Sequence, residues 1–341
     1  MLSKKTKESL EKMHYGIAGN HSAVQVCRWT KNSLNGKGAC WKEKFYGIKS
    51  HRCCQMSPAV MWCENSCLHC WRPITKVCDS NMKNAKIDEP KFIIEEILKQ
   101  RKKLMTGFKG DKKISRKKYF ESIEPTLFTF SLSGEPTLYP KLGELIKEIR
   151  KRKAVSFIVT NGLNPRVLKK LEKEKSLPTQ LTISMNAPNE KLYKIWHNSK
   201  NKNAWKEFNK SLEVMKTLKG KTRRAIRLTL VKPSINKKEI NAINNMSDEL
   251  TSQYASLIKK AEPDFVHVKG FKSIGYSRKR FDYDRQPFYE EVLDYAKKLM
   301  FELNKNTNSK IPWKILGKEN RSCVVVLGKN KKDMKIKKEE I

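Results

Sequence analysis

The chain has 341 residues, enough to bury one large core or a core with a small appendage. Its 73 Lys and Arg against 35 Asp and Glu give a formal net charge of +38. Self-repulsion at this level destabilises a compact protein unless an anion offsets it. A polyanionic partner such as RNA is therefore favoured over a Lys-rich surface that only adds solubility.

The sequence gives no sign of a membrane protein. No apolar stretch approaches the roughly 18 residues that span a bilayer, and residues 1–10 are charged and lack the apolar core of a signal peptide. We therefore expect no membrane association and a cytoplasmic location.

Cysteine is concentrated in one region. Eight of the nine cysteines lie between Cys27 and Cys78, and only Cys323 stands apart. Structural disulfides are rare in a reducing compartment, and an odd total argues against complete pairing. Iron–sulfur or other metal ligation is the leading interpretation of this cluster.

Apolar runs separated by helical stretches continue over about 200 residues, which favours a parallel α/β sheet. Six units are too few for a complete eight-stranded barrel, so we predict a partial (β/α)6 TIM-like barrel over residues 57–328. Residues 1–56 are expected to form an irregular, cysteine-rich cap, and residues 329–341 a disordered, charged tail. The expected strands are residues 59–62, 127–132, 155–159, 181–185, 226–230 and 265–268.

The first chemical motif is Cys63-x3-Cys67-x2-Cys70. Three thiolates on one loop can bind three corners of a [4Fe–4S] cluster, leaving the fourth iron open to chelate a substrate. The alternative is a zinc ion with His69 or Cys78 as its fourth ligand. The spacing of the motif resembles that of the radical S-adenosylmethionine (SAM) superfamily.

That resemblance implies a SAM pocket at the ends of the following strands. The segment Leu132-Ser133-Gly134-Glu135-Pro136 is similar to the Gly-Gly-Glu-Pro element that receives the methionyl amino group, with Ser133 in place of the first glycine. Asn161 either binds the cofactor or simply closes a turn. The residues expected at SAM are Ser133, Gly134, Glu135, Asn161, Ser184 and Asn186.

A second set of cysteines has two equal gaps, Cys27-x12-Cys40-x12-Cys53. These residues lie in a polar segment without an apparent core to bury them, so a second three-thiolate [4Fe–4S] cluster is expected. The alternative is a structural cluster or a zinc ion, with a fourth ligand from His21, His51 or Cys54.

The cysteine-rich segment narrows the resemblance to one family, the archaeal-type tRNA 4-demethylwyosine synthases. The similarity continues through the radical motif and covers most of the chain. It is carried by residues 19–24, 27–31, 40–48, 50–53, 55–58 and 270–277.

The resemblance implies a reaction and its partners. The family condenses a two-carbon unit from pyruvate with N1-methylguanosine, beside the anticodon of phenylalanine tRNA. The resemblance implies two [4Fe–4S] clusters, SAM, and a separate flavodoxin- or ferredoxin-like electron donor. We expect the protein to be a monomer. Lys42 is the implied lysine for an imine with pyruvate, against the alternative of a solvated surface lysine.

Several basic and aromatic residues are predicted to contact RNA. Other functions remain open from the sequence: another two-cluster radical SAM enzyme acting on RNA or protein, or a non-enzymatic iron–sulfur or zinc RNA-binding protein. The predicted RNA contacts are Arg223, Arg224, Arg278, Lys279, Arg280, Trp29, Trp71 and Trp196.

Overall fold

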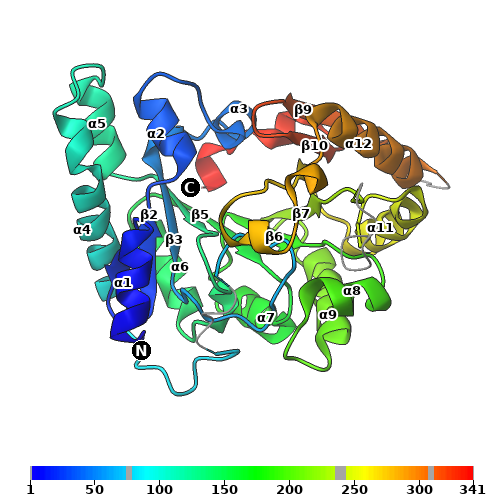
Figure 1. Ribbon diagram of the computed structural model, residues 1–341, viewed down its shortest axis with the longest axis horizontal. Helices are drawn as coiled ribbons and strands as arrows, with labels where there is room; N and C mark the ends of the chain where they lie inside the picture. The colour runs from blue at the N-terminus through cyan, green and yellow to red at the C-terminus, as the bar shows by residue number, and fades with distance from the viewer. Residues whose placement is uncertain (1, 74–78, 235–242, 306–310, 341) are drawn as a thin grey trace.

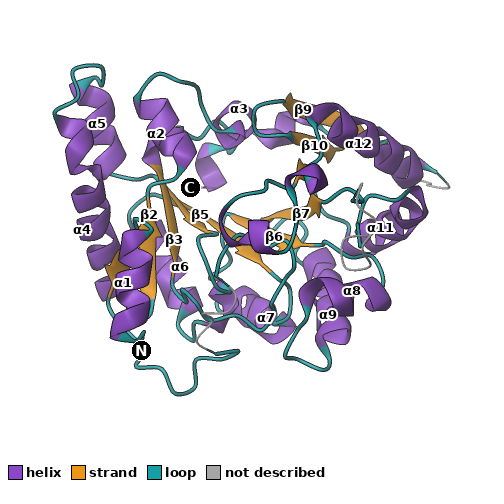
Figure 2. Cartoon of the chain, in the orientation of Figure 1, coloured by secondary structure: helices purple, strands orange, loops and turns teal. Residues whose placement is uncertain are grey.

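The computed structural model describes residues 2–73, 79–234, 243–305 and 311–340. It contains one ten-stranded sheet with the order β1-β2-β3-β4-β5-β6-β7-β8-β10-β9 (Figures 1 and 2). The strands from β3 to β8 pair in parallel, each with the next along the chain. They are β3 (Cys53–Ser57), β4 (Leu127–Phe130), β5 (Val155–Thr160), β6 (Gln180–Ser184), β7 (Arg223–Leu230) and β8 (Phe265–Gly270).

Helices follow the parallel strands and surround the sheet (Figure 1). In α6 the buried residues Leu142, Leu145, Ile146 and Ile149 recur at helical spacing, so one stripe of the helix packs on the strands. The fold is the predicted partial (β/α)6 barrel. No helix within the described ranges is long and apolar enough to cross a membrane. The main helices are α4 (Pro90–Lys109), α6 (Leu142–Lys151), α7 (Pro165–Lys173), α9 (Ala204–Thr217), α11 (Asp248–Ala261) and α12 (Tyr289–Asn304).

The first parallel strand is not where the sequence placed it. The prediction of a strand at residues 59–62 is wrong: these residues are buried in the loop that follows β3. The strand itself is polar on its inner face, with Cys53, Gln55 and Ser57, so it lacks the apolar pattern of the other strands. The predicted boundary between residues 56 and 57 falls inside it.

The segment before β3 is more regular than expected. Two of its strands extend one edge of the sheet by antiparallel pairing, and β10 and β9 extend the other edge in the same way. The elements before β3 are α1 (Lys4–Lys12), β1 (Gly16–Ala18), β2 (Ser22–Gln25), α2 (Arg28–Leu34) and α3 (Trp41–Tyr46); the late strands are β9 (Lys314–Glu319) and β10 (Val324–Gly328).

Helix α3 packs inside the barrel. Strand residues alternate between two apolar clusters: Leu127 and Phe265 belong to a small inner cluster, and their neighbours Phe128 and Val266 to the large outer one beneath the helices. Three side chains of α3 join the inner cluster, Trp41, Phe45 and Tyr46. The amino-terminal end of the barrel is therefore filled by a helix from the cysteine-rich segment.

The charged end of the chain, expected to be disordered, is folded against this end of the barrel. Met334 is buried in the inner cluster, and the Ile336 N–H donates to the Tyr46 carbonyl at 3.2 Å. The Arg223 guanidinium donates to the carbonyls of Asp333 (2.9 Å) and Met334 (2.7 Å). A buried arginine on β7 thus gives the tail a specific anchor.

This anchoring predicts a loss of stability in Met334→Ala. Removal of a buried methionine side chain leaves a cavity and costs about 2 kcal/mol, so the thermal unfolding midpoint should fall. Lys338→Ala, at an exposed position on the same tail, is the control and should leave the midpoint unchanged. Equal midpoints for the two variants would show that the tail does not contribute to the core.

Candidate functional site

The first cysteine triad lies on the loop after β3, at the carboxyl ends of the parallel strands. Burial raises the pKa of Cys63, Cys67 and Cys70, and the charge of the next cysteine raises the pKa of Cys63 and of Cys67 further. Three half-buried thiols whose thiolates would repel one another ionise more readily with a positive group among them. The core of a [4Fe–4S] cluster supplies that charge, so the donor set fits the predicted cluster.

Neighbouring elements hold this loop in place. The Leu68 N–H donates to the Trp196 carbonyl at 2.9 Å, on α8 (Glu190–His197), and Arg280 donates to the carbonyls of Leu68 (2.8 Å) and Cys70. The Trp196 indole N–H donates to His69 Nδ1 at 2.9 Å. His69 must then carry its proton on Nε2, which leaves no lone pair for a metal.

These contacts argue against a zinc ion in the first triad. Burial, then the charge of Arg280, lowers the pKa of His69 to about 4, so the ring is neutral, and its Nδ1 lone pair is taken by the Trp196 indole. Cys78, the other predicted zinc ligand, lies outside the described residues. Among the described residues no three His, Cys, Asp or Glu side chains converge on one point, as a single ion would require. Ligands of a cubane bind separate irons and are spread more widely.

Glu135 organises the ends of β4 and β5. One of its oxygens accepts from the hydroxyls of Thr137 and Thr160, both at 2.7 Å, and the other accepts from the Asn161 N–H at 2.7 Å. Burial, then the charge of Glu64, raises the pKa of Glu135 to about 7. The side chain therefore ties the ends of β4 and β5 together, and its carboxyl group carries a negative charge only part of the time near neutral pH.

Glu64 is a site residue that sequence reasoning missed. Its oxygens accept from the side-chain amides of Asn161 (3.1 Å) and Asn164 (2.7 Å), and burial raises its pKa. Two buried carboxyl groups beside Cys63 suit the ammonium and sulfonium charges of SAM. The signal in the sequence was its position, an acidic residue directly after a cluster cysteine.

Gly134 is required by the backbone geometry. Its φ is 71°, and a Cβ at this position would lie 1.9 Å from the Ala59 carbonyl oxygen and 2.7 Å from that of Trp62. The cysteine loop and the β4 loop thus meet too closely for any side chain. Neighbouring Ser133 is buried, with its hydroxyl 3.7 Å from the Met61 sulfur.

The remaining predicted SAM residues surround the same pocket. Asn186 accepts from the Thr229 N–H at 3.0 Å, and its amide nitrogen lies 3.5 Å from His69 Nε2. Ser184 faces the barrel interior at the end of β6, half-buried. Asn161 bonds to both acidic residues, so it has more than a turn role. Direct contacts of these residues with SAM stay a prediction.

Three different elements bring the second cysteine triad together. Cys27 precedes α2, Cys40 precedes α3 and Cys53 begins β3. Burial raises the pKa of Cys40 to about 11; Lys42 opposes the rise, and the charges of Cys27 and Cys53 add to it. As at the first triad, buried thiols that repel one another fit a cationic cluster core.

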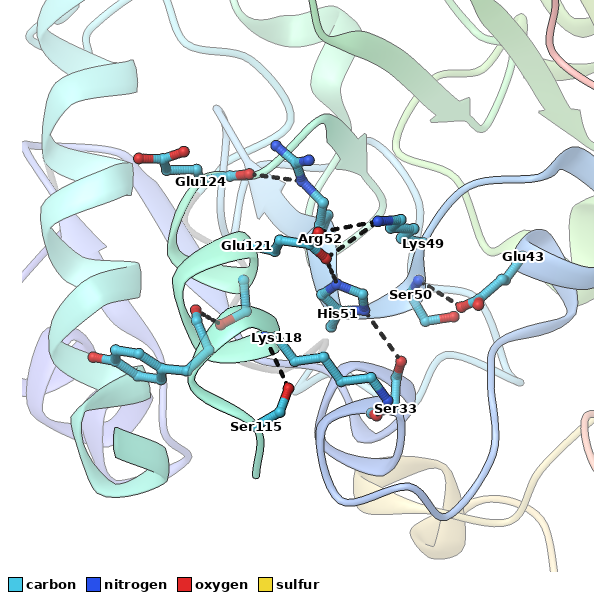
Figure 3. Close-up of polar contacts among 12 residues, drawn as sticks. Ser33, Glu43, Lys49, Ser50, His51, Arg52, Ser115, Lys118, Glu121 and Glu124 are labelled. Atoms are coloured by element: carbon cyan, nitrogen blue, oxygen red, sulfur yellow. Dashed lines mark hydrogen bonds and ion pairs between the residues drawn. The ribbon is translucent and has the colours of Figure 1, made fainter. Parts of the chain in front are cut away.

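None of the three predicted fourth ligands points toward this triad. Figure 3 shows His51 directed at Glu121 of α5 (Arg116–Ile123), with Nε2 2.6 Å from the carboxylate. His21 uses Nδ1 to contact the Pro58 carbonyl at 2.6 Å. Cys54 belongs to the outer apolar cluster, on the opposite face of β3 from Cys53. A zinc ion with any of these three ligands is not supported.

Lys42 lies beside the second triad rather than in open solvent. Its amine donates to Thr129 Oγ1 at 3.2 Å and to Cys53 Sγ at 3.6 Å. Burial favours the neutral amine, but the thiolates of Cys53, Cys40 and Cys27 outweigh it and raise the pKa of Lys42. The amine is thus held inside the barrel, facing the cysteines.

Part of the predicted RNA surface is wrong. Arg223 and Arg224 are buried; Arg223 anchors the tail, and Arg224 forms an ion pair with Asp264 at 2.6 Å. Trp196 is fully buried, and Arg280 supports the cysteine loop. Residues that remain at the surface are Arg278, Lys279 and Trp71, with Trp29 half-buried.

Comparisons with known proteins agree with this geometry. A family model described as the radical SAM superfamily matches residues 58–246, and one described as wyosine base formation matches residues 260–329. An S-adenosyl-L-methionine-dependent tRNA 4-demethylwyosine synthase of Pyrococcus horikoshii is 40% identical over 302 residues, covering 89% of this chain and 84% of that protein. The chain belongs to the tRNA 4-demethylwyosine synthase family. It is therefore a radical SAM enzyme, whose family uses a [4Fe–4S] cluster and SAM.

Other members of this synthase family match over similar lengths. A relative of the same name from Methanocaldococcus jannaschii is 34% identical over 303 residues, covering 88% of this chain and 90% of that protein. A structure of TYW1 with a lysine–pyruvate adduct bound superposes with a TM-score of 0.81 at 30% identity, over 99% of both chains. A crystal structure of archaeal TYW1 gives 0.73 at 29% identity, again over 99% of both chains.

The geometry predicts that Gly134→Ala abolishes SAM cleavage. The added methyl group would displace the loop that carries the first triad, because it meets backbone rather than a flexible side chain. Production of 5′-deoxyadenosine should fall at least about a hundredfold. Gly107→Ala, where a Cβ meets nothing within 4 Å, is the control. Normal cleavage by Gly134→Ala would contradict this account of the pocket.

Proposed function

We propose that this synthase condenses pyruvate with N1-methylguanosine, beside the anticodon of phenylalanine tRNA, to form 4-demethylwyosine. The relatives carry the name tRNA 4-demethylwyosine synthase, and the net charge of +38 suits an RNA substrate. The observation that carries the proposal is the placement of Lys42 inside the barrel, next to Cys53 of the second triad. At this position the Lys42 amine can react with a second substrate, away from the predicted SAM site.

The second triad, within residues 1–56, is proposed to hold a second [4Fe–4S] cluster. Its support is the donor set: two buried thiols and the half-buried Cys27, close enough for their charges to interact, with the predicted fourth ligands directed elsewhere. When bound, such a cluster supplies one iron with an open coordination position. That position suits the carboxylate and carbonyl oxygens of pyruvate.

Lys42 is proposed to form an imine with pyruvate. The amine nitrogen bonds to the ketone carbon, and the carbonyl oxygen leaves as water. A TYW1 structure of the same fold is named for a lysine–pyruvate adduct, which supports this chemistry. Once the three thiolates share their charge with iron, burial and the nearby Arg227 favour the neutral amine that the step needs.

The radical step is proposed to take place beside the first triad, at the carboxyl ends of the parallel strands. The first cluster and SAM supply a radical that removes hydrogen from the N-methyl group of the guanosine. Glu64 and Glu135 are placed to bind the positive groups of SAM, and Gly134 lets the two loops meet. We propose a separate flavodoxin- or ferredoxin-like protein as electron donor, and a monomeric enzyme.

Replacement of Cys27, Cys40 and Cys53 together by alanine tests the second cluster. The variant should retain about four irons per chain, against about eight in the parent, and still cleave SAM without product. Anaerobic iron analysis and mass spectrometry of the tRNA are the measurements, and Cys323→Ala is the control. Formation of 4-demethylwyosine at the parent rate would remove any substrate role for this triad.

Binding of tRNA should weaken steeply with salt. Neutralised phosphates release counterions, so affinity should fall at least about tenfold between about 50 mM and 200 mM salt. The double variant Arg278→Ala with Lys279→Ala, at exposed positions after β8, should lower the logarithmic slope by about two. The double variant Lys151→Ala with Arg152→Ala is the matched control. These two residues are also neighbours in sequence and exposed, but they lie at the amino-terminal end of β5. A flat salt dependence would argue against an electrostatic interface.

A further inference from the structure

The interior face of β7 and β8 carries positive side chains. Strand register places Arg227 between Ser184 of β6 and His267 of β8, and Lys269 lies opposite Thr229, one inward position further along. All of these face the inside, because Ala225 and Phe265, two residues earlier on their strands, belong to the inner apolar cluster. Together with Lys42, they put three cationic groups inside the barrel.

Arg227 differs from the other arginines of its strand. The terminal nitrogens of Arg223 donate to carbonyls of the tail, although its Nε also lacks a partner, and Arg224 pairs with Asp264. The Arg227 side chain forms no hydrogen bond within the described residues. The Nε of Arg227 is buried and has no hydrogen-bond partner among the described residues. Lys269 has only a long contact to the Ser322 carbonyl, at 3.4 Å.

No acidic side chain balances these cations on the interior face. Within β3 to β8, all of them described, none of the inward-facing residues is Asp or Glu. Those residues are every second one, counted from Cys53, Leu127, Val155, Gln180, Arg223 and Phe265. The core of a cubane is itself positive. Three thiolates bound to such a core therefore offset only part of the positive charge of Lys42, Arg227 and Lys269.

The pKa values of Lys269 and Arg227 show that this arrangement disfavours their charged forms. Burial, then the charge of Arg227, lowers the pKa of Lys269 to about 8, and burial lowers the pKa of Arg227. Arg227 and Lys269 are half-buried, and the Nε of Arg227 is buried without a partner among the described residues. Such a site favours an anion from outside the chain.

We propose that Arg227, supported by Lys269, binds the carboxylate of a small α-keto acid whose carbonyl faces Lys42. The inference rests on the proposed function and names the residues that select its second substrate. A guanidinium presents two parallel N–H groups that match a carboxylate, which a lysine amine cannot do.

Two other anions fit the position less well. The carboxylate of SAM is the nearer competitor, because Ser184, a predicted SAM residue, pairs in register with Arg227. The second site is favoured because Arg227 is close enough to Cys40 and Lys42 for their charges to interact. An RNA phosphate stays at the barrel mouth when a base is turned inward, because the backbone is too wide to follow.

The test compares pyruvate with methyl pyruvate, its uncharged ester, on the anaerobic, iron-loaded enzyme. Equilibrium dialysis measures binding of labelled pyruvate, and borohydride reduction followed by mass spectrometry measures the adduct formed with each ketone. In Arg227→Met, pyruvate should bind at least about tenfold more weakly, while adduct formation from the ester should not change. Arg227→Lys should restore part of the affinity, and Arg152→Met, at an exposed position, should match the parent.

The outcomes separate this inference from the imine proposal. Unchanged pyruvate binding in an Arg227→Met variant with parent iron content would overturn the inference, as would weaker SAM binding in place of weaker pyruvate binding. If the Arg227 effect on dialysis is present but no adduct forms on Lys42, the carboxylate site stands and the imine proposal fails alone.

Discussion

The parallel pairing of β3 with β4 is the constraint on which both sites depend. Cys53 is the first residue of β3, and the loop with Cys63 leaves its other end. A strand rises about 3.3 Å per residue, so the four steps from Cys53 to Ser57 separate the two ends of β3 by about 13 Å. That distance leaves room for substrates between the two cysteine triads. Helix α3 closes the amino-terminal end of the barrel and places Lys42 inside it.

The side chains beside the first triad are acidic and those beside the second triad are basic. This difference favours a different ligand at each triad. At the mouth, Glu64 and Glu135 form an acidic, buried pair beside the first triad, which suits the cationic groups of SAM. On the interior face, Lys42, Arg227 and Lys269 are close enough to cysteines of the second triad for their charges to interact. This difference in charge would favour SAM beside the two glutamates and the proposed keto acid beside Lys42 and Arg227.

Sequence reasoning succeeded where one residue type carries one role. The later strands were predictable, because apolar alternation indicates a strand. Metal ligation by the closely spaced cysteines stays a prediction. Sequence reasoning failed where burial changes the role of a residue. Arg223 and Arg224 looked like phosphate contacts, yet each satisfies a structural partner. Strand β3 was missed because its inner face is polar, and Arg227 because nothing in the sequence shows which arginine lacks a partner.

The separation of the two metal sites is tested most directly by electron paramagnetic resonance of the reduced, anaerobically reconstituted enzyme. With two clusters, each having an open iron, SAM should change the spectrum of one cluster and pyruvate that of the other, independently of the order of addition. A single cluster signal that responds to both molecules would contradict two separate sites.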